Sequence, residues 1–216
     1  LNTFLNAFTF PDKTCYPVAS TNLQDFYNLV DVYLDAVFFP LITPQTLMQE
    51  GWHYELNNLD DELAYKGVVF NEMKGAYSSP DDILGDESLM LLLPDTPYGF
   101  QSGGDPECIP ALTYEQFRLF HKNFYHPGNS KIFFYGDDDP ETRLKIINEY
   151  LNEFDPLKIH SLPGLQPLFL SPKRKNIPYD SGEDIDNAKA YLTVNWLLPE
   201  GNVPELVLSL GILDHI

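Results

Sequence analysis

The chain has 216 residues, 44% of them hydrophobic and 14% aromatic, which is enough for a packed core and excludes a disordered composition. Its 13 Lys and Arg residues against 32 Asp and Glu residues give a formal net charge of −19. Such an acidic surface disfavours nucleic acid and anionic membranes and favours a basic partner, although the charge also serves solubility alone.

Two cysteines, Cys15 and Cys108, are too few for a disulfide framework, and the chain has no Asn-x-Ser/Thr sequon. Both observations favour a reducing interior. The longest apolar runs, Val37–Phe39 and Leu89–Leu93, stop at prolines and are too short to span a membrane. Both ends of the chain fall inside apolar patterns, so we expect both to be cut, and the lack of a targeting segment then means little.

The first twenty residues predict two strands joined by a turn at Pro11–Asp12. Asn22 is typical of a helix N-cap and predicts a helix from Leu23 to about Phe39. This helix is apolar except for one polar stripe, so we expect it to be buried on most sides. A shorter helix is predicted over Thr46–Trp52, and a longer one from near Glu62 to about Tyr77.

Another short helix is expected after Ser79–Pro80, followed by a turn-rich stretch over Pro94–Pro110. Thr113 and Gln116 have the spacing of a capping box and predict the helix that follows them. Two further elements are expected before residue 155, a strand at Lys131–Tyr135 and a helix that starts at Asp139–Pro140.

Prolines and glycines become frequent from Asp155 to Asp186, which is typical of a linker between domains. Beyond it we expect a strand at Ala190–Leu198 and a helix that begins at Pro204. The chain then divides into a first domain (1–160), a linker (161–187) and the start of a second domain (188–216). The hairpin-like opening strands favour an α+β fold, with an antiparallel sheet covered by helices, over a parallel doubly wound fold.

Glu72 stands out among the residues of the predicted helix that ends near Tyr77. At helical spacing it lies in an apolar sector, four residues after Val68 and four before Ala76. A carboxylate on a buried face is costly unless it is paired, protonated or bound to a metal. A structural salt bridge, a cap to a neighbouring helix and a metal ligand are the three readings open at this point.

The five histidines do not complete a metal site. None of them has the His-x-x-x-His or His-x-x-Glu-His spacing, and His121 and His126 are five residues apart, so they cannot share a helix face. We interpret all five as structural residues. Gly-x-Ser-x-Gly, phosphate-loop and Cys-x-x-Cys motifs are also missing from the sequence.

Several segments together resemble the inverted-zincin peptidases related to pitrilysin and insulin-degrading enzyme, and within them the presequence protease branch that includes falcilysin. The first is Lys66–Gly75, which is similar to the helix that carries the third zinc ligand of that family. The resemblance covers nearly the whole chain and is carried further by three other segments: Leu1–Asn22, Glu50–Leu56 and Phe133–Pro140.

The resemblance implies a zinc site made of an inverted His-x-x-Glu-His helix and a glutamate on a later helix. By the match of motifs, Glu72 is that later ligand. The His-x-x-Glu-His helix lies upstream of Leu1 in the family, so we expect this chain to hold one of three protein ligands and no catalytic residue. It would then form most of a first peptidase domain and the start of a second related domain, and it would be inactive alone.

The resemblance also implies a substrate and a location. The strand at Asn6, Ala7, Phe8 and Thr9 is similar to the edge strand on which the family binds peptides through backbone hydrogen bonds. We expect a short, unstructured and basic peptide as substrate, such as a cleaved targeting presequence, and the rest of the polypeptide as the other partner. The location would be the mitochondrial matrix, the chloroplast stroma or a bacterial cytoplasm. A non-catalytic structural or docking homologue is the alternative.

Overall fold

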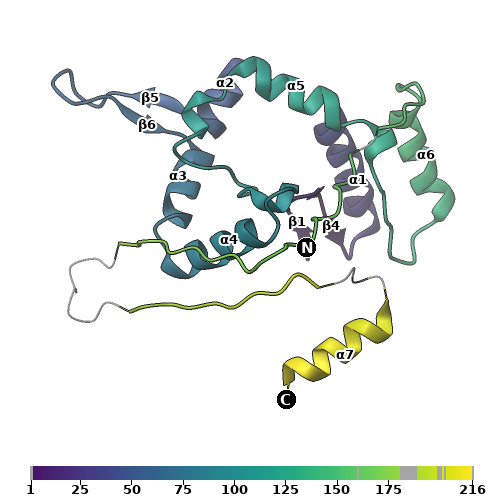
Figure 1. The fold of residues 1–216 in the computed structure, drawn as a ribbon. Coiled ribbons are helices and arrows are strands. Elements are labelled where there is room, and N and C mark those ends of the chain that lie inside the picture. The colour runs from purple at the N-terminus through teal and green to yellow at the C-terminus, as the bar shows by residue number, and fades with distance from the viewer. Residues whose placement is uncertain (1, 160, 181–188, 199–200, 202, 216) are drawn as a thin grey trace.

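The computed structural model describes residues 2–159, 161–180, 189–198, 201 and 203–215. The fold is α+β, as predicted, and its described strands form antiparallel pairs beside helices. The predicted antiparallel sheet is present as three two-stranded pairs. Figure 1 shows the helices arranged around the N-terminal strands, with α7 apart from the others.

The N-terminal strands form one antiparallel hairpin, as predicted. Its four strands are β1 (Thr3–Leu5), β2 (Phe8–Thr9), β3 (Thr14–Cys15) and β4 (Val18–Ser20). Strand β1 pairs with β4, and β2 pairs with β3. The tip is closed by a bond from the Phe10 N–H to the Lys13 carbonyl at 2.8 Å, which places the turn at the predicted Pro11–Asp12.

Helix α1 (Leu23–Phe38) begins where the sequence predicted. The Asn22 side chain accepts a hydrogen bond from the Asp25 N–H at 3.0 Å, which satisfies one of the unpaired amides of the first turn. The prediction of burial on most sides was wrong: only Val30 and Phe38 of this helix are buried. Its remaining apolar side chains face solvent or are half-buried, because few described elements pack around the helix.

The next segment differs from the prediction at one point. Helix α2 (Pro44–Thr46) continues into a π-helical turn, η1 (Leu47–Gly51), in agreement with the predicted short helix. The helix predicted from Glu62 is instead a hairpin, β5 (His53–Glu55) and β6 (Ala64–Lys66), followed by α3 (Val68–Ala76). Cross-strand packing explains the difference, since the rings of Tyr54 and Tyr65 lie 5.2 Å apart on opposite strands.

Helix α4 (Pro80–Leu92) is capped by Ser79 and is longer than the short helix predicted there. The turn-rich stretch after it contains two 3-10 turns, η2 (Pro97–Gly99) and η3 (Ile109–Ala111). The predicted capping box of Thr113 and Gln116 is present at the start of α5 (Tyr114–Phe124). A further 3-10 turn follows as η4 (Pro127–Asn129).

Two predicted strands are absent from the described chain. Lys131–Tyr135 and residues 190–198 have no hydrogen-bonded partner strand among the described residues, and a strand needs such a partner to form a ladder. The helices predicted after them are present as α6 (Pro140–Leu151), which Asp139 caps, and α7 (Pro204–His215). Residues 161–180 of the proline-rich segment contain no helix or strand, and Gln166 joins them to Asp95 by hydrogen bonds of 2.7 and 2.9 Å.

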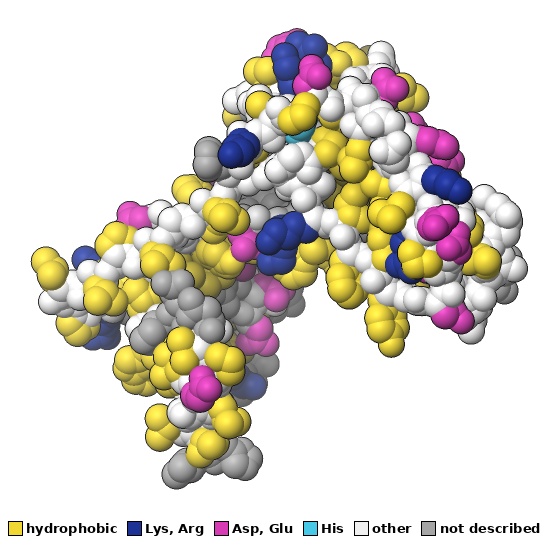
Figure 2. Space-filling model, turned by 90° about the vertical axis from the view of Figure 1, so that its right-hand side faces the viewer, with side chains coloured by type: hydrophobic (Ala, Val, Ile, Leu, Met, Phe, Trp, Pro, Cys, Tyr) yellow, Lys and Arg dark blue, Asp and Glu magenta, His cyan; other side chains and the backbone are white. Residues whose placement is uncertain are grey.

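A small buried cluster lies around α3, and the other buried apolar side chains, Val30, Phe38 and Ile147, lie on α1 and α6. Phe70, Met73 and Ile109 form the cluster around α3, and Trp52 and Tyr77 pack against it. Many large apolar side chains are exposed elsewhere, and Figure 2 shows them in several groups among acidic side chains. No helix within the described residues is long and apolar enough to cross a membrane.

Helix α6 is joined to α1 by a tyrosine at its C-terminal end. The Tyr150 hydroxyl donates to the Asp31 carboxylate at 2.6 Å and lies 3.1 Å from the Asp31 carbonyl oxygen. The hydrogen bond to the Asp31 carboxylate favours the protonated phenol and raises the pKa of Tyr150 from 10.0 to about 12. The contact is therefore sensitive to alkaline pH.

We expect the stabilising effect of Tyr150 to disappear at high pH. The folded-state pKa lies above the unfolded one, so this contribution is full below pH 10.0 and is lost as the pH rises to about 12. Urea midpoints of the wild type and of Tyr150→Phe, measured across this range, should converge. A difference between the two proteins that stays constant with pH would contradict this role of the hydrogen bond.

Candidate functional site

Helix α3 carries Glu72 and begins at a glycine that no other residue replaces easily. Gly67 has a φ of 148°, and a Cβ built on it would lie 2.1 Å from the Gly51 carbonyl oxygen. The chain therefore passes from β6 into α3 directly against the end of η1. This close approach of two backbones sets where α3 starts, and so sets the position of every side chain on it.

The structure corrects the predicted surroundings of Glu72. The buried face of α3 consists of Phe70 and Met73, whereas Glu72 is exposed. Val68 and Val69 share the outer face, with 55% and 37% of their surface exposed. The sequence pattern placed Glu72 in the apolar sector with Val68 and Ala76, and it could not show that the Phe70 side packs against the core.

The Glu72 carboxylate has no hydrogen bond or ion pair with any part of the chain that the structure describes. The predicted alternatives of a structural salt bridge or a helix cap are therefore not seen in these residues. An exposed carboxylate among exposed valines remains free to bind a metal ion or a partner from outside this segment.

A zinc ion would find one protein ligand here. Within the described ranges, no group of three His, Cys, Asp or Glu side chains is placed to hold a metal. His53 and His121 each contact a backbone carbonyl oxygen, those of Met48 and Val37, at 2.6 and 2.8 Å. A catalytic zinc site takes three protein ligands and a water, so the residues present fit one position of such a site.

The hydrogen bonds of the N-terminal hairpin show which backbone groups it leaves open. Phe8 pairs with Cys15 and Thr9 with Thr14. On either side, the Asn6 N–H donates to the Pro17 carbonyl and the Phe10 N–H donates to the Lys13 carbonyl. In the first half of the hairpin, the even-numbered residues therefore bond across it. The N–H and C=O groups of Ala7 and Thr9 therefore point to the outer edge, which pairs with no other described strand.

Two side chains modify this edge at its beginning. The Asn6 Oδ1 accepts a hydrogen bond from the Ala7 N–H at 2.8 Å. Across the hairpin, Pro17 accepts from the Asn6 N–H but has no N–H to return, so the ladder is interrupted between β1 and β2. The predicted substrate residues Asn6, Ala7, Phe8 and Thr9 are all exposed.

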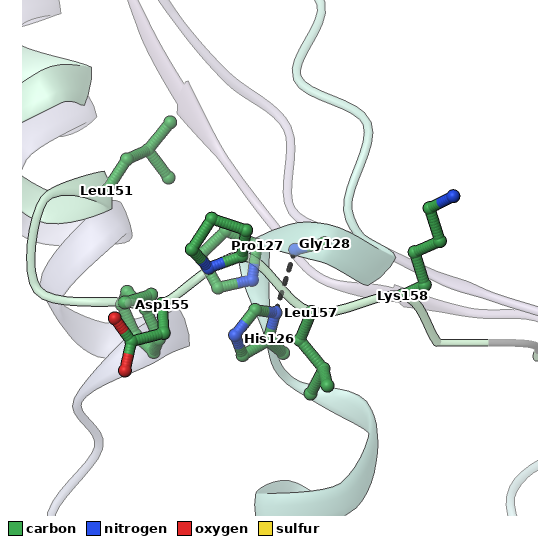
Figure 3. A pocket seen from close by; sticks show the side chains of 9 residues that line it. His126, Pro127, Gly128, Leu151, Asp155, Leu157 and Lys158 are labelled. Carbon is green, nitrogen blue, oxygen red and sulfur yellow. Dashed lines mark hydrogen bonds between the residues drawn. The ribbon is translucent and has the colours of Figure 1, made fainter.

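Glu72 and the edge strand lie on separate elements, α3 and β2, and no described hydrogen bond or ion pair joins them. A cavity of about 380 Å³ lies elsewhere, between η4 and the chain that follows α6. His126 accepts a hydrogen bond from the Gly128 N–H at its edge, as Figure 3 shows. None of the predicted site residues lines this cavity.

Comparison with known proteins places the chain among peptidases. It is 55% identical over its full length to presequence protease 1, chloroplastic/mitochondrial, of Arabidopsis thaliana, of which it covers 21%. It is 51% identical over its full length to protein HypA of Clostridium perfringens, of which it covers 23%. It is 42% identical over 93% of its length to the mitochondrial presequence protease of Mus musculus, of which it covers 20%.

A family model gives a second, narrower match. Residues 111–216 match the model described as the Peptidase M16 inactive domain. This range begins after both Glu72 and the edge strand, so it carries no information on either. The chain spans about a fifth of the length of the curated relatives it matches.

Proposed function

The chain belongs to the peptidase M16 family, and from that premise we propose that it is part of a zinc-dependent endopeptidase that degrades short unstructured peptides. The observation that carries the proposal is Glu72. Its carboxylate is exposed, has no partner in the described chain and lies in the segment that resembles the third-ligand helix of the family. The chain alone, with one ligand, would be inactive.

Glu72 would occupy one coordination position of a zinc ion, and the other ligands would come from outside this segment. A zinc ion bound there would polarise the scissile carbonyl and lower the pKa of a bound water. The carboxylate would keep its place because Phe70 and Met73 anchor the opposite face of α3 in the core. Val68 and Val69 would be covered by the element that brings the remaining ligands.

The outer edge of β2 would hold the peptide backbone. An extended peptide that adds to this edge would bond to the outward groups of Ala7 and Thr9. Such bonds involve only main-chain atoms, so binding would depend little on the sequence of the substrate. The net charge of −19 would favour basic peptides, and targeting presequences are rich in arginine.

A Thr9→Pro change tests the edge directly. Thr9 does not bond across the hairpin, so proline at this position removes only its outward N–H and leaves the inner ladder intact. We expect peptide binding to weaken about tenfold. The peptide loses one main-chain hydrogen bond, and the pyrrolidine ring of the new proline crowds its backbone. The measurement is the KM of the native protein for quenched fluorescent peptides.

Thr14→Pro is the matched control. Thr14 is the partner of Thr9, and its N–H points to the opposite edge of the hairpin, so this change should leave KM unaltered. Equal losses for both variants would mean that only hairpin stability is affected. The peptides should include a basic and an uncharged version, since equal KM values for the two would contradict the role of the acidic charge.

A non-catalytic homologue is the second candidate function. It is favoured by the match of residues 111–216 to a domain described as inactive. In such a protein the edge strand and the exposed face of α3 would serve docking, and Glu72 would bind no metal. Zinc content of the native protein separates the two candidates.

The location is proposed from the relatives. The plant and mouse relatives are named as chloroplastic or mitochondrial presequence proteases, which favours an organelle matrix or stroma for this protein. Relatives from Clostridium perfringens and Borreliella burgdorferi, 51% and 39% identical, favour a bacterial cytoplasm as the alternative. Fractionation of cells that express a tagged native protein would decide between them.

A further inference from the structure

The open edge of β2 does not offer all of its hydrogen-bonding groups. The register leaves four backbone groups directed outward, the N–H and the C=O of Ala7 and of Thr9. One of the four is already engaged, because the Ala7 N–H donates to the Asn6 Oδ1 at 2.8 Å. Three groups therefore remain for an incoming strand.

We propose that Asn6 caps the Ala7 N–H and so limits the number of main-chain hydrogen bonds that a peptide can form with this edge. The inference rests on the proposed peptide-binding function of the strand. With the cap in place, the only free outward N–H of β2 is that of Thr9. The facing carbonyls of an extended peptide recur every second residue, as the Ala7 and Thr9 N–H groups do, so the cap leaves one of these two donors for an added peptide.

The local sequence explains why the cap forms at this position. Pro17 has no N–H, so the Asn6 carbonyl receives no return bond and the ladder opens between β1 and β2. The exposed Asn6 side chain has no other described hydrogen bond, so its oxygen is free to turn to the next amide in the chain. Asn and Asp side chains commonly bond to nearby backbone amides in this way.

The cap also limits unwanted pairing. An exposed strand edge is a template for edge-to-edge association of protein chains, and natural sheets commonly block such edges. The side-chain cap on one N–H reduces the number of backbone groups that another chain can pair with, while the strand itself stays exposed. It can yield to a peptide, because a rotation of the Asn6 side chain is enough to release the amide.

The test compares Asn6→Ala with Asn6→Asp in the native protein. Alanine removes the capping oxygen, whereas aspartate keeps an oxygen in the same place and serves as the matched control. We expect the Ala7 amide to exchange its hydrogen at least about tenfold faster in Asn6→Ala, while the Phe8 amide of the inner ladder is unchanged. Asn6→Asp should retain the slow exchange at Ala7.

Binding is measured by fluorescence anisotropy with an uncharged, acetylated and amidated peptide rich in Thr and Val. We expect Asn6→Ala to bind this probe about fivefold more tightly, because one further backbone N–H becomes available to it. Single N-methylation along the probe should weaken binding to the wild type at fixed positions.

Unchanged exchange at Ala7, or equal or weaker probe binding by Asn6→Ala, would overturn the inference. These results are distinguishable from failure of the proposed function. If the wild type binds the probe and Thr9→Pro weakens it, the edge is a peptide site whatever Asn6 does. If no variant binds the probe, both proposals fail, and the exchange data then report only on the cap itself.

Discussion

A Glu72→Gln change is expected to lower the zinc affinity of the native protein by at least about 100-fold, since loss of a mere outer-shell partner already costs about 10- to 100-fold. The amide that replaces the carboxylate has no charge and is a poor zinc ligand. Helix α3 should be unaffected, because Glu72 is exposed and makes no described hydrogen bond or ion pair. Peptide hydrolysis should fall together with zinc content.

Zinc is measured by atomic emission after dialysis against a series of chelator concentrations. Glu149→Gln is the matched control, since Glu149 is also an exposed glutamate on a helix, α6, and no role is proposed for it. Both variants should be made in the native protein, and the chain of 216 residues should be measured beside it. We expect the short form to hold no zinc, because its described residues contain no group of three ligands.

Two outcomes would contradict the peptidase proposal. Zinc that persists in Glu72→Gln at wild-type affinity would mean that another residue is the ligand. A native protein that binds no zinc would favour the non-catalytic homologue, in which Glu72 has a docking role. Because fluorescence anisotropy measures binding of the uncharged probe to Thr9→Pro without hydrolysis, the two halves of the proposed site can fail independently.

A Gly67→Ala change is expected to destabilise the fold by about 3 kcal/mol, a large part of the stability of an ordinary domain. Gly67 has a φ of 148°, in a region that residues with a Cβ rarely adopt, and the new Cβ would lie 2.1 Å from the Gly51 carbonyl oxygen. The neighbour is backbone and cannot rotate away. The start of α3 would have to shift, and Glu72 with it.

The free energy of unfolding from urea titration measures this effect. Gly85→Ala is the control, because Gly85 lies inside α4 and a Cβ there meets nothing within 4 Å. Alanine in an exposed helix interior should stabilise the protein by about 0.5–1 kcal/mol. If Gly67→Ala were as mild as the control, α3 would not depend on the close approach of Gly67 and Gly51.

Glu72 shows how much of the candidate site the sequence could predict. The motif indicated the residue as a candidate ligand, which stays a prediction, and its predicted place on a helix is confirmed. Its environment was predicted wrongly, because periodicity places residues on a helix but does not say which neighbours the fold supplies. The apolar pattern over Val68–Ala76 contains two faces, and the packing of Ile109 and Trp52 decides that the Phe70 face is the buried one.

For the edge strand, too, the sequence predicted the element and only the structure showed its surroundings. The Pro11–Asp12 turn and the flanking apolar residues were enough to predict the hairpin. Which of its amides face outward depends on the register, which became visible only in the pairing of Phe8 with Cys15. The cap that Asn6 places on the Ala7 N–H had no distinct signal in the sequence, since asparagine in a strand has many other possible partners.

The sequence alone therefore determined the local structure, such as helix caps and tight turns. The caps at Asn22, Thr113 and Asp139 and the turn at Pro11–Asp12 rest on contacts between residues close in the chain, and all were predicted correctly. Two predicted strands, Lys131–Tyr135 and residues 190–198, find no partner strand among the described residues, and a strand forms only where another segment pairs with it. Tertiary structure decided these pairings, the buried face of α3 and the exposure of Glu72, since each depends on which remote residues come into contact.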